Sequence, residues 1–277
     1  MNNSVNSSSL LAPSQVAELL IQPVIGESVA AQVSRVILSN TNSLRVPIVT
    51  DDPSAAWVPE GGEIPISDLE VTELEIPALK LAGLTMISNE LIADSGPDVA
   101  AEVGRGLARD LARQLDAAYF GTTVTNGPSG LASLSGIQSV VTAGAFENLD
   151  PFSEAQALTE TVGATVGAFV TSPQVALQLA KLKTGSGSNA PLLGSDPTQP
   201  TKRVIAGVPL VVSPKVEANA VWAIPAERAV VTIRQDADIA SDGSVGFTSA
   251  RTAVRAIMRV GIGFPHPAAI VKITQTL

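Results

Sequence analysis

Three short segments contain residues that could support catalysis or phosphate binding, but each lacks a part that the chemistry requires. A phosphate-binding loop needs Lys and then Ser or Thr after its glycines, whereas Asn-Ala-Pro follows the glycines of residues 185–188. The nucleophile-elbow pattern Gly-x-Ser-x-Gly fails at residues 127–131, where leucine stands in place of the last glycine. A histidine base needs a nucleophile to activate, and no nucleophile motif accompanies His266, which stands between two prolines. None of these segments predicts a catalytic site.

Two carboxylates and one indole form the remaining candidate for chemistry. Glu60 and Glu63 flank a Gly-Gly turn, and a pair of carboxyl groups is what a glycosidase uses to cleave its substrate. The surrounding sequence is not rich in aromatic residues, because only Trp57 lies near the pair. We therefore predict that the protein is not an enzyme. A soluble hydrolase stays open as an alternative, which a monomeric peak in size-exclusion chromatography would support.

The composition excludes several further classes of site. The 277 residues carry a formal net charge of −9, with no cysteine, one histidine and 3% aromatic residues. Without cysteine there is no thiolate nucleophile, zinc ribbon or iron–sulfur site, and one histidine excludes a multi-histidine metal site. The negative charge and the few aromatics argue against nucleic-acid binding through a basic face or through base stacking. From this composition we expect no cofactor and no metal. We also expect no membrane span, since no apolar run approaches about 20 residues, and no signal peptide.

The segment from residue 44 to residue 79 predicts a protruding β-ribbon. A strand-like stretch at 44–49 and an alternating stretch at 69–79 are separated by the turn-rich residues 57–63. Two arms of about 15 residues would make a ribbon roughly 50 Å long. Pro47 and Pro77 suit an edge ribbon and would damage a central strand. Because a two-stranded hairpin is marginal alone in water, we expect this ribbon to rest on another molecule.

The same segment is acidic throughout. Between Val46 and Leu79 it has eight acidic residues and no basic one. These charges could form a solvated face, could protect the ribbon edges from unwanted strand pairing, or could match basic residues on a neighbouring copy. The acidic residues are Asp51, Asp52, Glu60, Glu63, Asp68, Glu70, Glu73 and Glu75.

Residues 97–121 predict one long helix with two distinct faces. Pro97 suits the first turn, and Gly121 suits the end. Apolar residues step by four along one stripe, and Arg105, Arg109 and Arg113 step by four along a stripe about 200° away. One face should therefore pack against the protein while the other shows a row of guanidinium groups. This row could also be locally paired with Asp110 or Asp116.

The rest of the chain mixes both kinds of element without regular βαβ repetition, which indicates the α+β class. Residues 153–170 look helical, and residues 168–171 read as a buried strand. A further helix is expected from Ser172 to about Lys183. Strands are expected at 207–213, 221–224 and 268–273. A long alternating strand is expected at 245–260, with one face made of Phe247, Ser249, Arg251, Ala253, Arg255, Ile257 and Arg259.

The order of these elements resembles the major capsid protein family of tailed bacteriophages, which has the HK97-type shell fold. Six stretches carry the resemblance: Arg45–Ile48, Ala56–Ser67, Ile87–Leu91, Val99–Phe120, Gly207–Leu210 and Pro267–Val271. The resemblance implies an HK97-type fold with an N-terminal arm (1–40), an extension loop (41–82), a peripheral domain (83–145) with the spine helix at 97–121, an axial domain (146–236), a return strand of the peripheral domain (237–261) and a C-terminal strand of the axial domain (262–277). Residues 184–201 would be the axial loop that meets symmetry mates.

The resemblance also implies the function and the partners. We expect a major capsid protein that assembles with itself, as pentamers and hexamers, into an icosahedral shell around the double-stranded DNA of the phage. Assembly would take place in the cytoplasm of the host bacterium, with a portal, a separate scaffolding protein and a decoration protein as further partners. DNA would be enclosed without sequence-specific binding, and no membrane would take part. The alternative within this fold is an encapsulin-type nanocompartment, whose N-terminus would carry a structured cargo-docking helix.

We expect the acidic extension loop to meet one of two arginine rows of an adjacent subunit. One row is on the spine helix and the other is on the alternating strand. The candidate contact residues are Trp57, Glu60, Glu63, Glu70, Glu73, Glu75, Arg105, Arg109, Arg113, Arg251, Arg255 and Arg259.

The shell should not be covalently crosslinked. Some members of the resembled family join their subunits by Lys–Asn isopeptide bonds that use a loop lysine and a nearby acid. Here no lysine lies between Arg45 and Lys80, and no Asp or Glu follows Asp242. Denaturing gel electrophoresis of assembled shells should give one band at the subunit mass, and a covalent ladder would contradict this prediction.

Overall fold

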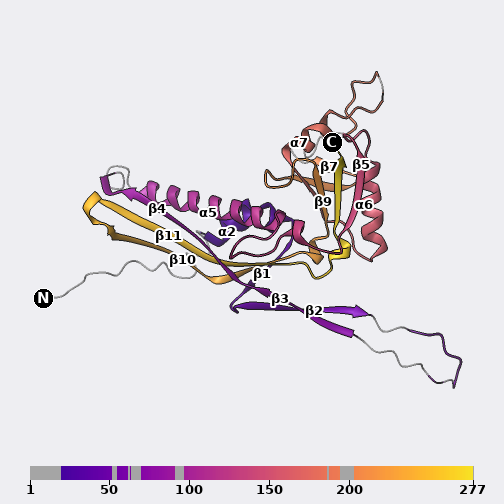
Figure 1. The fold of residues 1–277 in the computed structure, drawn as a ribbon, viewed down its shortest axis with the longest axis horizontal. Helices are drawn as coiled ribbons and strands as arrows, with labels where there is room; N and C mark the ends of the chain where they lie inside the picture. Colours follow the sequence, from indigo (N-terminus) through magenta and orange to yellow (C-terminus); the bar gives the residue numbers. More distant parts are fainter. Residues whose placement is uncertain are drawn as a thin grey trace.

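A computed structural model describes residues 20–51, 55–61, 63, 70–90, 97–185, 187–193 and 203–276. The described strands form a four-stranded sheet, a six-stranded sheet and a separate two-stranded ribbon (Figure 1). The helices are α2 (Gln22–Glu27), α3 (Val29–Val33), α5 (Pro97–Phe120), α6 (Asp150–Thr161) and α7 (Pro173–Lys181). The strands are β1 (Arg35–Ser39), β2 (Ser43–Asp51), β3 (Glu70–Pro77), β4 (Leu79–Ser88), β5 (Gln138–Ala143), β6 (Ala168–Thr171), β7 (Arg203–Ile205), β8 (Val208–Val212), β9 (Ala220–Ile224), β10 (Val230–Gly246), β11 (Arg251–Gly263) and β12 (Val271–Thr276).

The four-stranded sheet has the order β1-β10-β11-β4, and the long helix α5 lies along one of its faces (Figure 1). Strands β10, β11 and β4 are antiparallel neighbours, whereas β1 pairs with β10 in parallel. The apolar stripe of α5 includes Leu111 and Leu115, which share one buried cluster with Met258 and Val260 of β11. The predicted helix thus buries its apolar stripe against the sheet, and its opposite face stays exposed.

The six-stranded sheet has the order β5-β12-β9-β6-β8-β7 and is separate from the first sheet. Helices α6 and α7 pack with one of its faces in a second buried cluster, which contains Phe152 of α6 and Leu179 of α7. Trp222 of β9 belongs instead to the cluster that holds Tyr119 and Phe120, at the end of α5. The two larger sheets are therefore joined by a continuous apolar core at the end of the long helix.

Strands β2 and β3 form an antiparallel ribbon that pairs with neither larger sheet, and it leaves the body on the side of the four-stranded sheet opposite α5 (Figure 1). Pairing runs from Ser43 opposite Pro77 to Asp51 opposite Glu70. The sequence pattern predicts longer arms, and the residues that would continue them, 52–54 and 64–69, lie outside the described part of the chain. Ile76 of the ribbon is buried against the body, while Glu73 and Glu75 on the other face are exposed.

The last part of the N-terminal region is fastened to α5 by hydrogen bonds. Asp116 accepts from the Ser28 hydroxyl at 2.7 Å and from the backbone N–H groups of Val29 at 3.2 Å and Ala30 at 2.9 Å. The hydroxyls of Tyr119 and Ser34 lie 2.7 Å apart in a second buried hydrogen bond. Asp116 thus satisfies N–H groups at the start of α3 that have no partner within the helix, and it is unavailable to the arginines of α5.

Several elements differ from the sequence expectation. Residues 245–260 are not one strand, because β10 ends at Gly246 and a short 3₁₀ turn at 247–249 leads through the left-handed Ala250 (φ 49°) into β11. Phe247 and Ser249 lie in that turn and not on the arginine face of a strand. Where a single return strand was expected at 237–261, the structure has a hairpin of two strands. In the sequence, Pro13 and Ser14 suit the start of a short helix that would continue to about Leu20, and this stretch falls almost wholly outside the described residues.

Sheet membership also crosses the expected domain boundaries. Strand β5 lies in the six-stranded sheet, because it pairs in parallel with β12. Strand β1, at the end of the expected N-terminal arm, belongs to the four-stranded sheet. A boundary drawn by sheet membership would therefore fall before Gln138, although the expected peripheral domain runs to residue 145. The division into arm, loop, peripheral and axial domains stays a prediction.

Asp116 should make the stability of the subunit depend on pH. Burial raises the pKa of this carboxyl above its ordinary value of 3.8, against the opposing effect of its hydrogen bonds. A raised pKa means that the contribution of the group to stability is complete below its unfolded pKa and is lost as the pH rises through its folded pKa. The contribution of Asp116 to the free energy of unfolding should therefore fall across that window, so the wild-type chain should lose stability relative to Asp116→Asn. This fall should be absent in Asp116→Asn.

Denaturant unfolding of the unassembled chain between about pH 3 and pH 7 measures this difference. Asp116→Ala serves as the second variant, because it leaves buried N–H groups of Val29 and Ala30 without their acceptor. We expect it to lower the free energy of unfolding by about 1–3 kcal/mol. The same pH slope in the wild type and in Asp116→Asn would contradict the prediction.

Candidate functional site

One face of the ribbon carries its charges. Residues directly opposite each other in an antiparallel pair point to the same face, so Arg45 lies beside Glu75 and Pro47 beside Glu73. Arg45 also forms an ion pair with Glu73, with 3.7 Å between Nη1 and Oε2. Glu75 has no ion pair among the described residues, so the paired part of this face keeps a net negative charge. The opposite face is formed by Leu44, Val46, Ile48, Thr72, Leu74 and Ile76.

Residues 55–61 lie at the far end of the loop, away from both larger sheets (Figure 1). The side chain of Trp57 is fully exposed there, with 104% relative accessibility, and Glu60 and Glu63 are also exposed. Glu70 begins β3, and its side chain lies outside the described part of the structure. A fully exposed tryptophan is unusual in a soluble chain, because indoles are normally buried in cores or interfaces.

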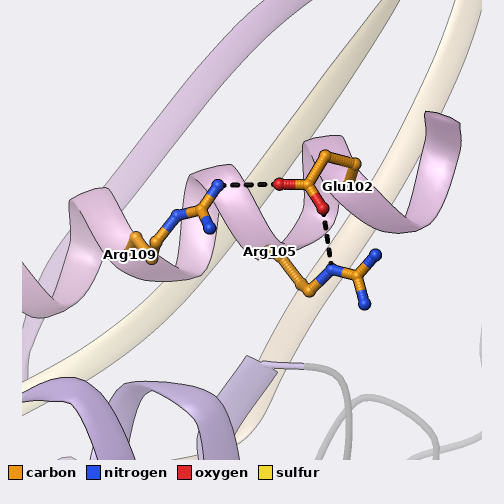
Figure 2. Close-up of polar contacts among 3 residues, drawn as sticks. All are labelled: Glu102, Arg105 and Arg109. Atoms are coloured by element: carbon orange, nitrogen blue, oxygen red, sulfur yellow. Dashed lines mark hydrogen bonds and ion pairs between the residues drawn. The ribbon is translucent and has the colours of Figure 1, made fainter.

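The arginine row of α5 is partly neutralised by its own helix. Figure 2 shows Glu102 between two arginines, with Oε2 accepting from Nε of Arg105 at 3.0 Å and Oε1 accepting from Nη2 of Arg109 at 2.9 Å. The hydrogen bond from Arg109 and the positive charge of Arg105 lower the pKa of Glu102 below its usual value. The local partner of the row is therefore Glu102, and neither Asp110 nor Asp116 pairs with it. Arg113 is exposed and has no ion pair within the described residues.

The second arginine row lies on the face of the four-stranded sheet that points away from α5. Strand register places Arg251 beside Ser88, Arg255 beside Leu84, and Arg259 beside Lys80. Arg255 pairs with Asp238 of β10 at 3.1 Å. Arg251 is exposed and has no ion pair among the residues that the structure describes.

Apolar side chains share this sheet face with the cations. Leu84 is 68% exposed and Met86 is 45% exposed, both on β4. We call this surface the open face and define it by Lys80, Leu84, Met86, Arg251, Arg255 and Arg259. The sequence reasoning identified its arginines but missed Leu84 and Met86. Their signal was the two-residue alternation of 79–88, which places 81, 83, 85 and 87 toward α5 and leaves the even positions outside.

The described part of the chain has no obvious centre for chemistry. It contains no group of three or more His, Cys, Asp or Glu side chains placed to hold a metal ion. None of its helices is both long enough and apolar enough to cross a membrane. A cavity of about 770 Å³ between α7 and β8 is lined by a single charged side chain, that of Arg203, among apolar and neutral ones. The features that stand out are therefore surfaces for binding: a projecting ribbon and an open sheet face.

Comparison with known proteins identifies the family. The sequence model of the phage capsid family matches residues 8–275. The chain belongs to the phage capsid family. No curated protein matches it in sequence.

Solved structures from phages and from a GTA capsid share the fold of this family member. A chain of Microbacterium phage Oxtober96 is 18% identical with a TM-score of 0.71, and the match covers 100% of this chain and 95% of that one. The capsid of an empty GTA particle computed with C5 symmetry gives 18% identity and a TM-score of 0.72 over 100% and 94% of the two chains. A chain of Gordonia phage Cozz is 19% identical with a TM-score of 0.68, and the match covers 91% of this chain and 87% of that one.

Membership of the phage capsid family confirms the main expectations from the sequence. The protein has the mixed α+β, HK97-type fold, is a major capsid protein of the virion, and is a structural protein rather than an enzyme. The twelve candidate contact residues stay predictions, because one copy of a capsid protein has no neighbour against which they could be tested.

Proposed function

We propose that this capsid protein closes its shell by laying the β2–β3 ribbon of one copy on the open face of an adjacent copy, within pentamers and hexamers. The single observation that carries the proposal is that one chain exposes two surfaces of opposite charge. The ribbon leaves the body with a net negative face, and the four-stranded sheet presents cations around exposed Leu84 and Met86. Glu75 on the ribbon and Arg251 on the open face have no ion pair among the described residues.

The open face is a better partner for the ribbon than the exposed face of α5. Arg105 and Arg109 already share the carboxylate of Glu102, so binding a second acid would have to replace or crowd that interaction. Each row keeps one arginine without an ion pair among the described residues, Arg113 on α5 and Arg251 on the sheet. The open face differs because its strand β4 also exposes the apolar side chains of Leu84 and Met86. Complementary charge would then set the register of the ribbon, because electrostatic matching contributes to specificity and to association rate more than to affinity.

The contact is expected to be weak for each copy. An exposed ion pair contributes about 0–1 kcal/mol, whereas full burial of a Leu or Met side chain contributes about 1.5–3 kcal/mol. Burial of Leu84 and Met86 should therefore outweigh the ion pairs. Many such contacts hold a closed shell together, while each one alone is weak enough for a misplaced subunit to leave.

We also propose that the shell encloses the double-stranded DNA of a phage without reading its sequence. A net charge of −9 argues against a broad electrostatic hold on phosphates. A portal, a separate scaffolding protein and a decoration protein are further proposed partners, and they follow from the family rather than from a surface of this chain.

Charge reversal on the open face should block assembly without unfolding the subunit. Arg251→Glu should reduce the yield of closed shells at least tenfold, because the reversed side chain would face the carboxylates of the ribbon. Thermal unfolding of the unassembled variant should stay close to that of the wild type, since Arg251 is exposed and makes no ion pair within the described chain. Negative-stain electron microscopy of purified protein counts the shells.

Two further variants make this test specific. Arg113→Glu is the matched control, because it reverses an exposed, unpaired arginine of α5, and it should leave the shell yield near that of the wild type. Combining Arg251→Glu with Glu75→Arg should restore part of the yield. Loss of shells in Arg113→Glu with normal assembly of Arg251→Glu would assign the contact to α5 instead. Normal yield in both would exclude both arginine rows.

Assembly should also bury Trp57. The chain has two tryptophans, of which Trp222 is fully buried and Trp57 fully exposed. The emission that Trp57 contributes is the difference between the wild-type spectrum and that of Trp57→Phe. We expect this difference spectrum to shift to shorter wavelength when shells form. A difference spectrum that keeps its solvent-exposed maximum in shells would exclude Trp57 from the interface.

A further inference from the structure

The ribbon meets the body of its own chain at a small contact, and we propose that this contact sets the angle at which the ribbon projects. We infer that Ile76 of β3, seated on Gly261 and Gly263 of β11, is a positioning residue for the ribbon. We call the three residues the root socket. This inference does not depend on which surface of a neighbouring copy the ribbon meets.

Ile76 is the most deeply buried side chain of the ribbon. It is 1% exposed, whereas the side chains described from Val71 to Glu75 on the same strand are exposed or half-buried. Leu74, two residues earlier on the same face, is half-buried. The apolar face of the ribbon therefore touches the body over a short length at its root, and the socket is the centre of that contact.

The two glycines supply the space that Ile76 fills. A Cβ added at Gly263 would lie 2.5 Å from Cγ1 of Ile76, and nearer still to its Cδ1. A Cβ added at Gly261 would lie 2.8 Å from Cγ2 of Ile76 and 2.7 Å from the backbone oxygen of Pro77. Such distances are too short for real contacts, so any side chain at either position would push against the ribbon.

Close approach, and not an unusual backbone conformation, explains glycine at these two positions. Neither residue has a positive φ, so an L-amino acid could adopt the local backbone. Glycine weakens the interior of a strand and often marks a place where another backbone approaches closely. At Gly261 the approaching backbone is that of the ribbon, through the oxygen of Pro77, whereas Gly263 is approached by the side chain of Ile76.

The socket lies where the ribbon joins the sheet. Only Ala78 separates the end of β3 from the start of β4, and Leu79 already pairs with Val260 of β11. The Ala78 N–H donates to the Asn42 oxygen at 2.8 Å and closes the base of the ribbon. Because β2 and β3 are paired along their length, a change at the socket should turn the ribbon as one unit.

The displacement should be measurable on the ribbon itself. Val71 lies five residues from Ile76, about 16 Å along the strand. A rotation of about 10° at the socket would move it by about 3 Å. The chain has no native cysteine, so nitroxide labels on V71C and on L177C of α7, both at exposed positions, would report a single distance by pulsed electron paramagnetic resonance.

Three substitutions on this labelled background test the socket in the unassembled full-length chain. Gly263→Ala should shift the mean distance by about 3 Å, since the added Cβ displaces Ile76. Ile76→Ala should broaden the distance distribution without that shift, because the socket is then empty. Gly263→Ala combined with Ile76→Ala should lose the shift. Gly243→Ala is the matched control on β10, where the nearest atom to an added Cβ is Thr252 Oγ1 at 3.7 Å, and it should leave the distance unchanged.

The readouts separate positioning from simple stability. Thermal unfolding is recorded for each variant, because a residue that only stabilised the fold would lower the unfolding temperature and leave the distance unaltered. If Gly263→Ala does not fold, Ile76→Ala alone decides, and an unchanged width of its distribution overturns the proposal. Shell yield is measured separately. A socket that behaves as expected together with normal assembly of Arg251→Glu would keep this inference while rejecting the proposed ribbon contact.

Discussion

A two-stranded ribbon has two faces and no second layer to cover them, and residues 43–51 and 70–77 form such a ribbon outside both larger sheets. Its root is buried through Ile76, while its other face shows Glu73 and Glu75 to solvent. A segment of this kind gains little from its own chain. In our proposal the missing layer is a further copy of the same protein, and the surface chemistry of this chain is interpreted from that constraint.

The long helix α5 organises the rest of the molecule. Its apolar stripe packs on the four-stranded sheet, and its last turn joins the core that also contains Trp222 of the other sheet. Asp116 and Tyr119, one turn apart on the same helix, hold the residues that precede β1. Glu102 pairs with Arg105 and Arg109 on the outer face of α5, so these two arginines are already engaged within the subunit. The open face of the sheet combines its arginines with the exposed apolar side chains of Leu84 and Met86, and it is therefore the better surface for a neighbour.

Local rigidity and weak contacts serve assembly together. A ribbon that bound its neighbour tightly could trap errors, and a ribbon without a fixed direction would seldom find its neighbour. The root socket would supply direction through close packing, which tolerates little displacement. The exposed charges and the side chains of Leu84 and Met86 would supply a modest attraction. Direction and attraction then come from different residues, so each can be altered without the other.

Features with a local period were predictable from the sequence alone. The alternation of the ribbon strands, the four-residue steps of α5 and the arginine spacing of β11 depend only on the geometry of one element. The absence of cysteine and the single histidine excluded thiolate nucleophiles, zinc ribbons, iron–sulfur sites and multi-histidine metal sites. These exclusions were possible because composition can be interpreted without knowing the fold. These patterns sufficed to identify the fold class and the family resemblance.

Only the tertiary structure decided which elements meet. The turn between β10 and β11 lay hidden in a continuous alternation, because Gly246 and the left-handed Ala250 interrupt the strand without breaking the pattern of side chains. Asp116 turned toward α3 rather than toward the arginines of its own helix. Leu84 became exposed, and Gly263 received Ile76, through pairings between segments more than 150 residues apart. Such contacts depend on how distant parts of the chain are brought together, and a local period carries no information about that.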